Sequence, residues 1–281
     1  MDLLKLLLIF ILIVVFLGLK KPLYLVILGA TILLGLFFRM PAPAFLSTCG
    51  RSLISWETIN FMLIIWLVML VEGLMTRYNY LQRILKAMDS VFNSRKFDII
   101  SMPMIIGFLP SAGGALFSCP MVAEAASETE ISPERQAVIN IYYRHVMEIF
   151  FPTYPSLILT MQISGFSISE IVSYTFPLAI LVCLLGLAYV RGVPKQPKAE
   201  RSRRLAVRVW LLLFSLWPFL LLILLILGIG LPVWLSVAIA LLALLAVIRP
   251  PLKTLPSLVV KASKWRLLLS MAAVLCFKDI L

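Results

Sequence analysis

Small residues and proline interrupt an otherwise apolar stretch between residues 98 and 125. The interruption, from Leu109 to Ser118, reads Leu-Pro-Ser-Ala-Gly-Gly-Ala-Leu-Phe-Ser. Proline and paired glycines break helices, and a break leaves backbone N–H and C=O groups without helical partners. At membrane depth such groups persist only where protein surrounds them or where they line a polar cavity, and transporters use them to hold a solute. The solute-contacting residues predicted here are Ser111, Ala112, Gly113, Gly114 and Ser118.

A second interruption lies in the apolar segment 140–163. Pro152 and Pro155 stand three positions apart, and two prolines at this spacing do not fit an undisturbed helix. We therefore predict that residues 151–156 are unwound and lie beside the first interruption. The hydroxyl groups expected to join the first break in one polar pocket belong to Thr153, Tyr154 and Ser156.

Three ionisable residues, Arg144, His145 and Glu148, precede the second interruption. Arg144 and Glu148 are four residues apart, so they share one helix face. A charged side chain at the bilayer centre costs about 2.5–3.5 kcal/mol on insertion scales, so its presence needs a reason. Two interpretations stay open: an ion pair that holds this helix to a neighbour, or a supporting group for proton coupling or solute contact. His145 leads the second interpretation, because it is the one histidine of the chain and imidazole titrates near neutral pH.

Composition indicates an all-α, polytopic membrane protein. Hydrophobic residues make up 62% of the 281 residues, and the mean hydropathy of +1.05 is far above that of a soluble domain. Soluble and nucleic-acid-binding classes are excluded, because a net charge of +12 in a membrane protein marks cytoplasmic loops. The cysteines share no short spacing, and no nucleotide-binding G-x-x-x-x-G-K-[ST] motif occurs. We therefore expect no cofactor beyond sodium or a proton as the coupling ion.

The elements that must position these residues are apolar runs of about 20 residues, the length that crosses a bilayer. They fall at 3–19, 22–38, 58–76, 140–163, 169–190, 210–228 and 232–248, and an eighth begins near residue 266. Lys and Arg are concentrated in the connections 77–97, 191–208 and 249–266. The positive-inside rule predicts that these three loops are cytoplasmic.

This orientation constrains segment 98–125. The flanking basic loops are both expected in the cytoplasm, so the chain must cross the membrane an even number of times between them. Spans 140–163 and 169–190 already supply two crossings. Each half of segment 98–125 has only about 13 residues, or roughly 20 Å of helix, which is too short for another pair. We therefore predict a re-entrant hairpin that enters from the cytoplasm and turns near Pro110 to Gly114.

Trp56 and Trp265 introduce spans of opposite orientation, which is typical of inverted repeats. The sequence accordingly predicts four segments. Residues 1–57 hold two transmembrane helices and an outer loop, and residues 58–190 form the first inverted repeat, with the hairpin and the broken helix. Residues 191–265 hold basic cytoplasmic loops and two linking transmembrane helices, and residues 266–281 begin a truncated second repeat.

Two motifs resemble the domain of unknown function 401 family of prokaryotic integral membrane proteins. They are the interrupted stretch Leu109–Val122 and the paired segments Asn140–Glu148 and Pro152–Pro155. That family is placed in the ion transporter superfamily with gluconate permeases and citrate and dicarboxylate symporters. The resemblance implies an inverted-repeat fold in which a hairpin tip and a helix break in each half hold the solute and any coupling sodium. It also implies that this chain carries half of the site, as a fragment or beside a homodimer mate or partner chain.

These observations predict a secondary transporter, or permease, of a small anion or carboxylate, coupled to sodium or protons, in the prokaryotic inner membrane. A helix N-terminus at Gly113–Gly114 would offer N–H donors and a positive dipole end to the anion. The alternative is a non-transporting membrane subunit or assembly factor. An intramembrane enzyme is less favoured, because it would need a Ser111–His145 pair outside any paired catalytic motif. The expected partners are the lipid bilayer and a small anionic solute, and not nucleic acid.

Overall fold

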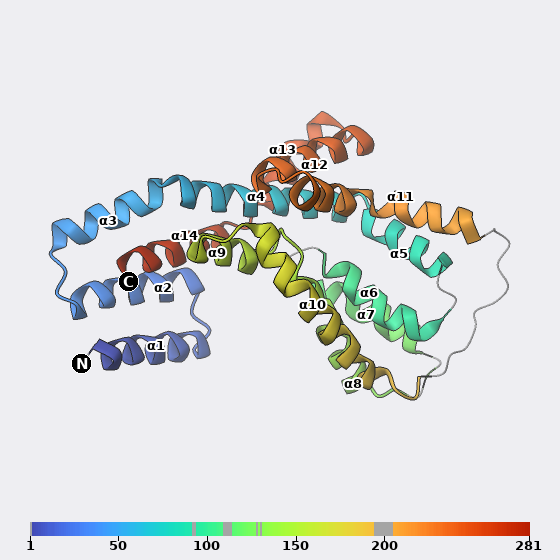
Figure 1. The fold of residues 1–281 in the computed structure, drawn as a ribbon, viewed down its shortest axis with the longest axis horizontal. Helices are drawn as coiled ribbons and strands as arrows, with labels where there is room; N and C mark the ends of the chain where they lie inside the picture. Colours follow the sequence, from blue (N-terminus) through green and yellow to red (C-terminus); the bar gives the residue numbers. More distant parts are fainter. Residues whose placement is uncertain (1, 92–93, 109–113, 128, 130, 194–204) are drawn as a thin grey trace. The chain divides into compact units, whose positions relative to one another are not determined.

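The chain is helical in a computed structural model that describes residues 2–91, 94–108, 114–127, 129, 131–193 and 205–281 (Figure 1). No strand occurs among these residues. Three of the described helices are long and apolar enough to cross a membrane, namely Trp56–Arg77, Ile168–Val190 and Ala206–Gly228. Two shorter apolar helices, Leu23–Phe37 and Val233–Ile248, coincide with other predicted spans. The prediction of an all-α protein is confirmed for the described residues, and these apolar helices are compatible with the predicted membrane protein.

Several connections between the described α-helices are single turns of tighter or wider helix. The α-helices are α1 (Asp2–Gly18), α2 (Leu23–Phe37), α3 (Ala42–Ile54), α4 (Trp56–Arg77), α5 (Tyr80–Val91), α6 (Arg95–Ile106), α7 (Gly114–Ala126), α8 (Pro133–Val146), α9 (Pro155–Ser164), α10 (Ile168–Gly186), α11 (Leu205–Ile223), α12 (Val233–Ile248), α13 (Leu255–Ala262) and α14 (Trp265–Ile280). The single turns are η1 (Met147–Ile149), η2 (Leu187–Val190), η3 (Leu224–Gly228) and η4 (Leu252–Thr254).

The chain forms two compact units, and the division runs through α4. The first unit comprises Met1–Trp66 and Ser263–Leu281. In it α1 packs on α2, and α14 packs on both α2 and α3. A small apolar core joins three of these helices, with Ile9 from α1, Ala30 and Leu34 from α2, and Phe277 and Ile280 from α14. Contact between segments far apart in sequence therefore holds this unit together.

The second unit, Leu67–Ala262, contains both predicted interruptions. Helices α6, α7, α8 and α10 pack on one another around one core. The buried residues of this core are Ile99, Ile100, Val122, Ala126, Ile131, Ile139, Tyr143, Val146, Ala179, Val190 and Val193. The neighbouring hydroxyl of Tyr142 donates to the carbonyl of Val182 at 2.7 Å, which fixes α8 against α10. The hairpin arms are thus part of the main packing of the unit.

Local signals explain where α8 and α10 begin. Pro133 follows Ser132, whose hydroxyl accepts from the N–H of Arg135 at 3.3 Å, and proline is favoured in the first turn of a helix. Helix α10 begins with a reciprocal capping box between Ser167 and Glu170. The first turns of both helices therefore have partners for backbone donors that would otherwise lack them.

Segment 98–125 contains two helices, α6 and α7, that lie against each other (Figure 1). Both also pack on α8. The turn predicted near 110–114 falls between them, and residues 109–113 lie outside the described part of the chain. The structure therefore provides two packed arms, and the re-entrant path through a membrane stays a prediction.

Segment 140–163 is broken as predicted, although the break is shifted. Helix α8 ends at Val146, η1 covers the next three residues, and 150–154 are outside any helix. Pro155 and Ser156, predicted to be unwound, instead form the first turn of α9. The reason is that proline has no N–H to satisfy and its fixed φ suits the first helical position. Pro155 therefore restarts the helix, whereas the residues before it are unwound.

Three helices occur where the sequence analysis predicted loops. They are α3 in the predicted outer loop, α5 within loop 77–97, and α13 within loop 249–266. Helix α5 carries charged and apolar residues on different faces, and it packs on α11. Such a helix lacks the continuous apolar run that marks a membrane span, so a search for spans passes over it.

Candidate functional site

The second interruption places its residues in a buried position. Phe151, Thr153 and Tyr154 are all buried between η1 and α9. Ser156, one turn further on, is exposed on α9. Of the three hydroxyl residues predicted at this break, Thr153 and Tyr154 are therefore inside the protein and Ser156 is at its surface.

The first interruption is described only from Gly114 onward. Gly114 begins α7, and Ser118, one turn later, is fully buried. Ser111, Ala112 and Gly113 lie outside the described residues. The N-terminus of α7 therefore coincides with the predicted anion-facing glycine, and the described part of the hairpin contributes Ser118 to the interior.

The two interrupted segments meet at Gly107. The hydroxyl of Tyr154, in the helix break, donates to the carbonyl oxygen of Gly107. Gly107 follows directly after α6, and its own N–H donates to Pro103 at 2.8 Å. This contact ties the end of the first hairpin arm to the unwound residues before α9. The turn that was predicted to lie beside the second interruption falls within residues 109–113, outside the described part of the chain, so the meeting of the two breaks themselves stays a prediction.

Gly107 also lies against the backbone of α8. A Cβ atom at this position would overlap the carbonyl oxygen of Arg144 and lie 3.2 Å from the carbonyl carbon. It would also lie 2.9 Å from the carbonyl oxygen of Met104. The backbone of Gly107 has ordinary right-handed helical angles, so it is the close approach, and not the conformation, that requires glycine.

The three ionisable residues form one group at the end of α8. His145 Nδ1 lies 2.8 Å from a carboxylate oxygen of Glu148, and Arg144 Nη1 lies 3.9 Å from the other oxygen. The Arg144 side chain is 7% exposed, whereas those of Glu148 and His145 are 36% and 48% exposed. Arg144 and His145 occupy the last turn of α8, where the helix dipole favours a cation. The group therefore has a buried member and two accessible ones.

A charged side chain on a third helix, Glu72 of α4, also acts on this site. Glu72 on α4, together with Glu148 and Arg144, acts electrostatically on the hydroxyl of Tyr154. Glu72 lies in the part of α4 that belongs to the second unit, and it is half-buried. The candidate site is defined here as Gly107, Tyr154, Arg144, His145 and Glu148, with Glu72 beside it.

The space beside Thr153 is small and apolar. It holds about one water molecule, since a water-sized sphere can occupy ≈ 10 Å³ of it. Aromatic rings close it, with Phe108 stacked on Phe219 at 4.6 Å and edge-on to Phe151 at 5.0 Å between centroids. The cavity is lined by Val68, Val71, Phe108, Phe151, Thr153, Phe219, Leu222 and Val237. Thr153 is its one polar residue, so this described cavity differs from the polar pocket that the sequence predicted.

A comparison with known protein families shows which family the chain belongs to. The family described as "Protein of unknown function (DUF401)" matches residues 3–281. The chain belongs to the DUF401 family. None of the curated proteins matches the chain. The family match covers both interrupted segments and all of the candidate site.

The arrangement in this DUF401 protein offers a contact between His145 and Glu148 and a helix N-terminus at the break. His145 and Glu148 can share a proton across 2.8 Å, and the break presents an N-terminal helix end at Pro155. The described residues include no group of three His, Cys, Asp or Glu side chains that could hold a metal ion. The described residues of the site can act through hydrogen bonding and through the dipole of the helix that begins at Pro155.

Sequence reasoning missed two residues of the site, Gly107 and Glu72. Gly107 stands two positions before the predicted turn, and a glycine beside a Pro/Gly run does not by itself indicate a close approach to another helix. Glu72 is near the end of its span, where a carboxylate commonly reaches water at the interface. An acidic residue within an otherwise apolar span was the available signal.

Proposed function

We propose that this DUF401 protein is a secondary transporter of a small anion or carboxylate, with sodium or protons as the coupling ion. The observation that carries the proposal is the hydrogen bond from Tyr154 to Gly107. It joins the end of a hairpin arm to a helix break, and both are elements whose backbone needs polar partners in a membrane. Transporters form midplane solute sites from such discontinuous helices.

The solute in this proposal binds to helix N-termini. Helix α7 begins at Gly114 and α9 begins at Pro155, and the positive end of a helix dipole attracts an anion. Ser111, Gly113 and Ser118 of the hairpin and Thr153 of the break would supply further donors. The preference for an anion follows from these helix ends, and Arg144 adds a positive charge nearby.

The coupling step in this proposal uses His145 and Glu148. Their contact at 2.8 Å and their partial exposure allow a proton to enter and leave the pair. Protonation of the imidazole would turn a hydrogen bond from a neutral donor to the carboxylate into an ion pair, so the charge state would follow the proton gradient. Sodium coupling would instead leave transport insensitive to the loss of the imidazole.

The membrane topology in this proposal follows the positive-inside rule. Loops 77–97, 191–208 and 249–266 face the cytoplasm of a prokaryotic cell, and the hairpin of α6 and α7 is re-entrant. Residues 58–190 form one inverted repeat, related to those of the ion transporter superfamily.

Transport currents test the proposal. The purified chain is reconstituted in proteoliposomes on a solid-supported membrane, and gluconate, citrate or succinate is applied under a sodium or a proton gradient. We expect a current with at least one of these carboxylates. It should be lost in Gly107→Ala and kept in Gly50→Ala, because a Cβ at Gly50, on α3, meets no atom within 4 Å. Absence of current with all three carboxylates under both gradients would contradict transport by this chain alone.

A non-transporting membrane subunit is the second candidate, and the apolar cavity beside Thr153 favours it. Three aromatic rings and aliphatic side chains line the small cavity next to the break, as in a packing contact between helices. If this function is correct, Gly107→Ala should release a co-purifying membrane protein from the native membrane extract. No carboxylate should then give a current with the chain alone.

A further inference from the structure

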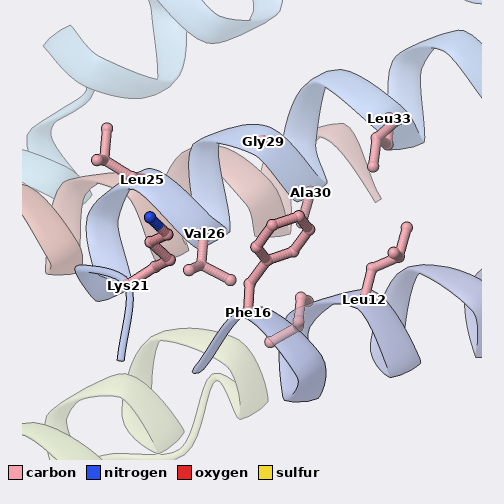
Figure 2. A pocket seen from close by; sticks show the side chains of 9 residues that line it. Leu12, Phe16, Lys21, Leu25, Val26, Gly29, Ala30 and Leu33 are labelled. Carbon is pink, nitrogen blue, oxygen red and sulfur yellow. The ribbon is translucent and has the colours of Figure 1, made fainter. Parts of the chain in front are cut away.

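A groove runs between α1 and α2 in the first unit. Leu12 and Phe16 on α1 face Val26 and Ala30 on α2, and Lys21 stands at one end (Figure 2). The groove has a volume of about 260 Å³ and is open along one side. Its remaining lining residues are Ile13, Leu25, Gly29 and Leu33, all of which are apolar. Lys21 is therefore the one charged group on an otherwise hydrocarbon-like surface.

Gly29 gives the groove its depth. A Cβ at this position would meet no atom within 4 Å, so the space in front of its backbone is open. The next residue, Ala30, belongs to the apolar core that joins α1, α2 and α14. The floor of the groove is thus built on a packed part of the unit, and a larger side chain at Gly29 would extend into the open space.

In the proposed topology, the ammonium group of Lys21 lies at the cytoplasmic surface of the membrane, where anionic lipid headgroups gather. Lys20 and Lys21 form the turn between α1 and α2. Loop 77–97 is expected in the cytoplasm, so α4 runs inward and α2, the span before it, runs outward. The Lys20–Lys21 turn then faces the cytoplasm, where the membrane surface is negatively charged. Among the described residues Lys21 has no ion pair, so its ammonium group is available to an external anion.

We propose that this groove binds one acyl chain of an anionic phospholipid of the cytoplasmic leaflet, with the phosphate of its headgroup on Lys21. An apolar groove of this kind excludes water, because it offers a water molecule almost no hydrogen-bond partners. This inference rests on the proposed membrane topology, in which lipid chains surround α1 and α2 and compete for the space at high local concentration. The lysine then selects an anionic headgroup over a zwitterionic one.

The groove follows α1 and α2 from Lys21 toward Leu33 and is open along one side (Figure 2). An extended hydrocarbon chain has the shape to lie along such a groove, and the lysine at its end matches the negative charge of a phospholipid headgroup.

Native mass spectrometry of the purified, full chain tests the proposal. The protein is equilibrated in detergent with equal amounts of dioleoylphosphatidylglycerol and dioleoylphosphatidylcholine, and retained lipid is counted. We expect phosphatidylglycerol to be retained about fivefold better, which is the factor that one lysine near a membrane surface provides. Lys21→Gln should remove this preference while leaving total acyl-chain binding in place, and as an exposed substitution it does not threaten folding.

Gly29→Leu fills the groove and should reduce retention of both lipids by about tenfold. Gly18→Leu is the matched control, because Gly18 also has no atom within 4 Å of a Cβ and lies outside the groove. Unchanged lipid retention in Gly29→Leu would overturn the proposal. So would equal retention of the two lipids by the unmodified protein, or a shift from dimer to monomer in Gly29→Leu with lipid retention unchanged, since a second copy would then occupy the groove.

Discussion

The substitution Gly107→Ala tests the contact on which the candidate site depends. It adds one methyl group where α6 ends, directly against the backbone of Arg144. The change leaves the preferred backbone angles of residue 107 available, because glycine there already has right-handed helical angles. Any effect must therefore come from the collision between the new methyl group and α8.

The magnitude follows from the geometry. The added carbon would lie 3.2 Å from the Arg144 carbonyl carbon, whereas carbon atoms pack at about 3.5–4.0 Å, so α6 and α8 must separate by roughly 0.5 Å or more. Overpacking of this kind costs about 1–3 kcal/mol. The same displacement stretches the hydrogen bond from Tyr154 to Gly107, which contributes about 0.5–1.5 kcal/mol. We expect a total loss of roughly 2–4 kcal/mol in the free energy of unfolding.

Thermal unfolding in detergent, followed by intrinsic fluorescence, measures this loss as a fall in Tm on the order of 5–15 °C. Gly50→Ala is the control, since its methyl group meets open space on α3 and alanine favours a helix. We expect the control to be as stable as the unmodified protein or slightly more stable. If Gly107→Ala unfolds at the same temperature as Gly50→Ala, then α6 does not approach α8 as described and the candidate site is not assembled.

Three further substitutions probe the neighbouring contacts. Tyr154→Phe removes the donor to Gly107 and should lower the unfolding free energy by about 1 kcal/mol, with carboxylate currents reduced; equal currents in both proteins would remove Tyr154 from the site. Glu148→Gln weakens the contact with His145 and should abolish the dependence of these currents on a proton gradient, whereas persistence of that dependence would exclude the pair as the coupling group. Arg135→Met removes two hydrogen bonds from the guanidinium to backbone carbonyls at the end of η2 and should lower Tm by a few degrees. An unchanged Tm would show that these exposed bonds contribute nothing measurable.

The membrane spans could be predicted because their signal is local. The run predicted at 22–38 corresponds to α2 at Leu23–Phe37, and the run at 232–248 corresponds to α12 at Val233–Ile248. Each needs only about 20 adjacent apolar residues and a boundary residue, here Pro22 and Pro232, that precedes the first helical turn. Helix α5 escaped the same search because its apolar residues are spaced around charged ones.

The break in segment 140–163 could be predicted from its prolines, but its bounds could not. Two prolines three apart indicate an interruption, yet the residue that restarts the helix depends on which proline takes the first position of α9. Pro155 takes that position. The exposed position of Ser156 follows from this choice, because it places Ser156 on a regular helix and away from the unwound residues.

The polarity of the space beside Thr153 could not be predicted, because its walls come from distant parts of the sequence. Phe219 on α11 stacks on Phe108, which directly follows Gly107. The stack depends on tertiary packing between residues separated by about two-fifths of the chain. A hydroxyl residue at a helix break predicts a polar neighbour only when the chain segments across from it are known, and here they are aromatic.

The sequence left the roles of the three ionisable residues open, and the structure distinguishes them by burial. Arg144 is buried in the last turn of α8, and the negative end of that helix gives its charge a favourable place without any solute. A buried guanidinium cannot lose its proton, so Arg144 suits a fixed structural charge. His145 and Glu148 are in contact and remain partly exposed, so water can reach both side chains. The proposed transporter therefore uses Arg144 as a fixed charge and His145 with Glu148 as the coupling group.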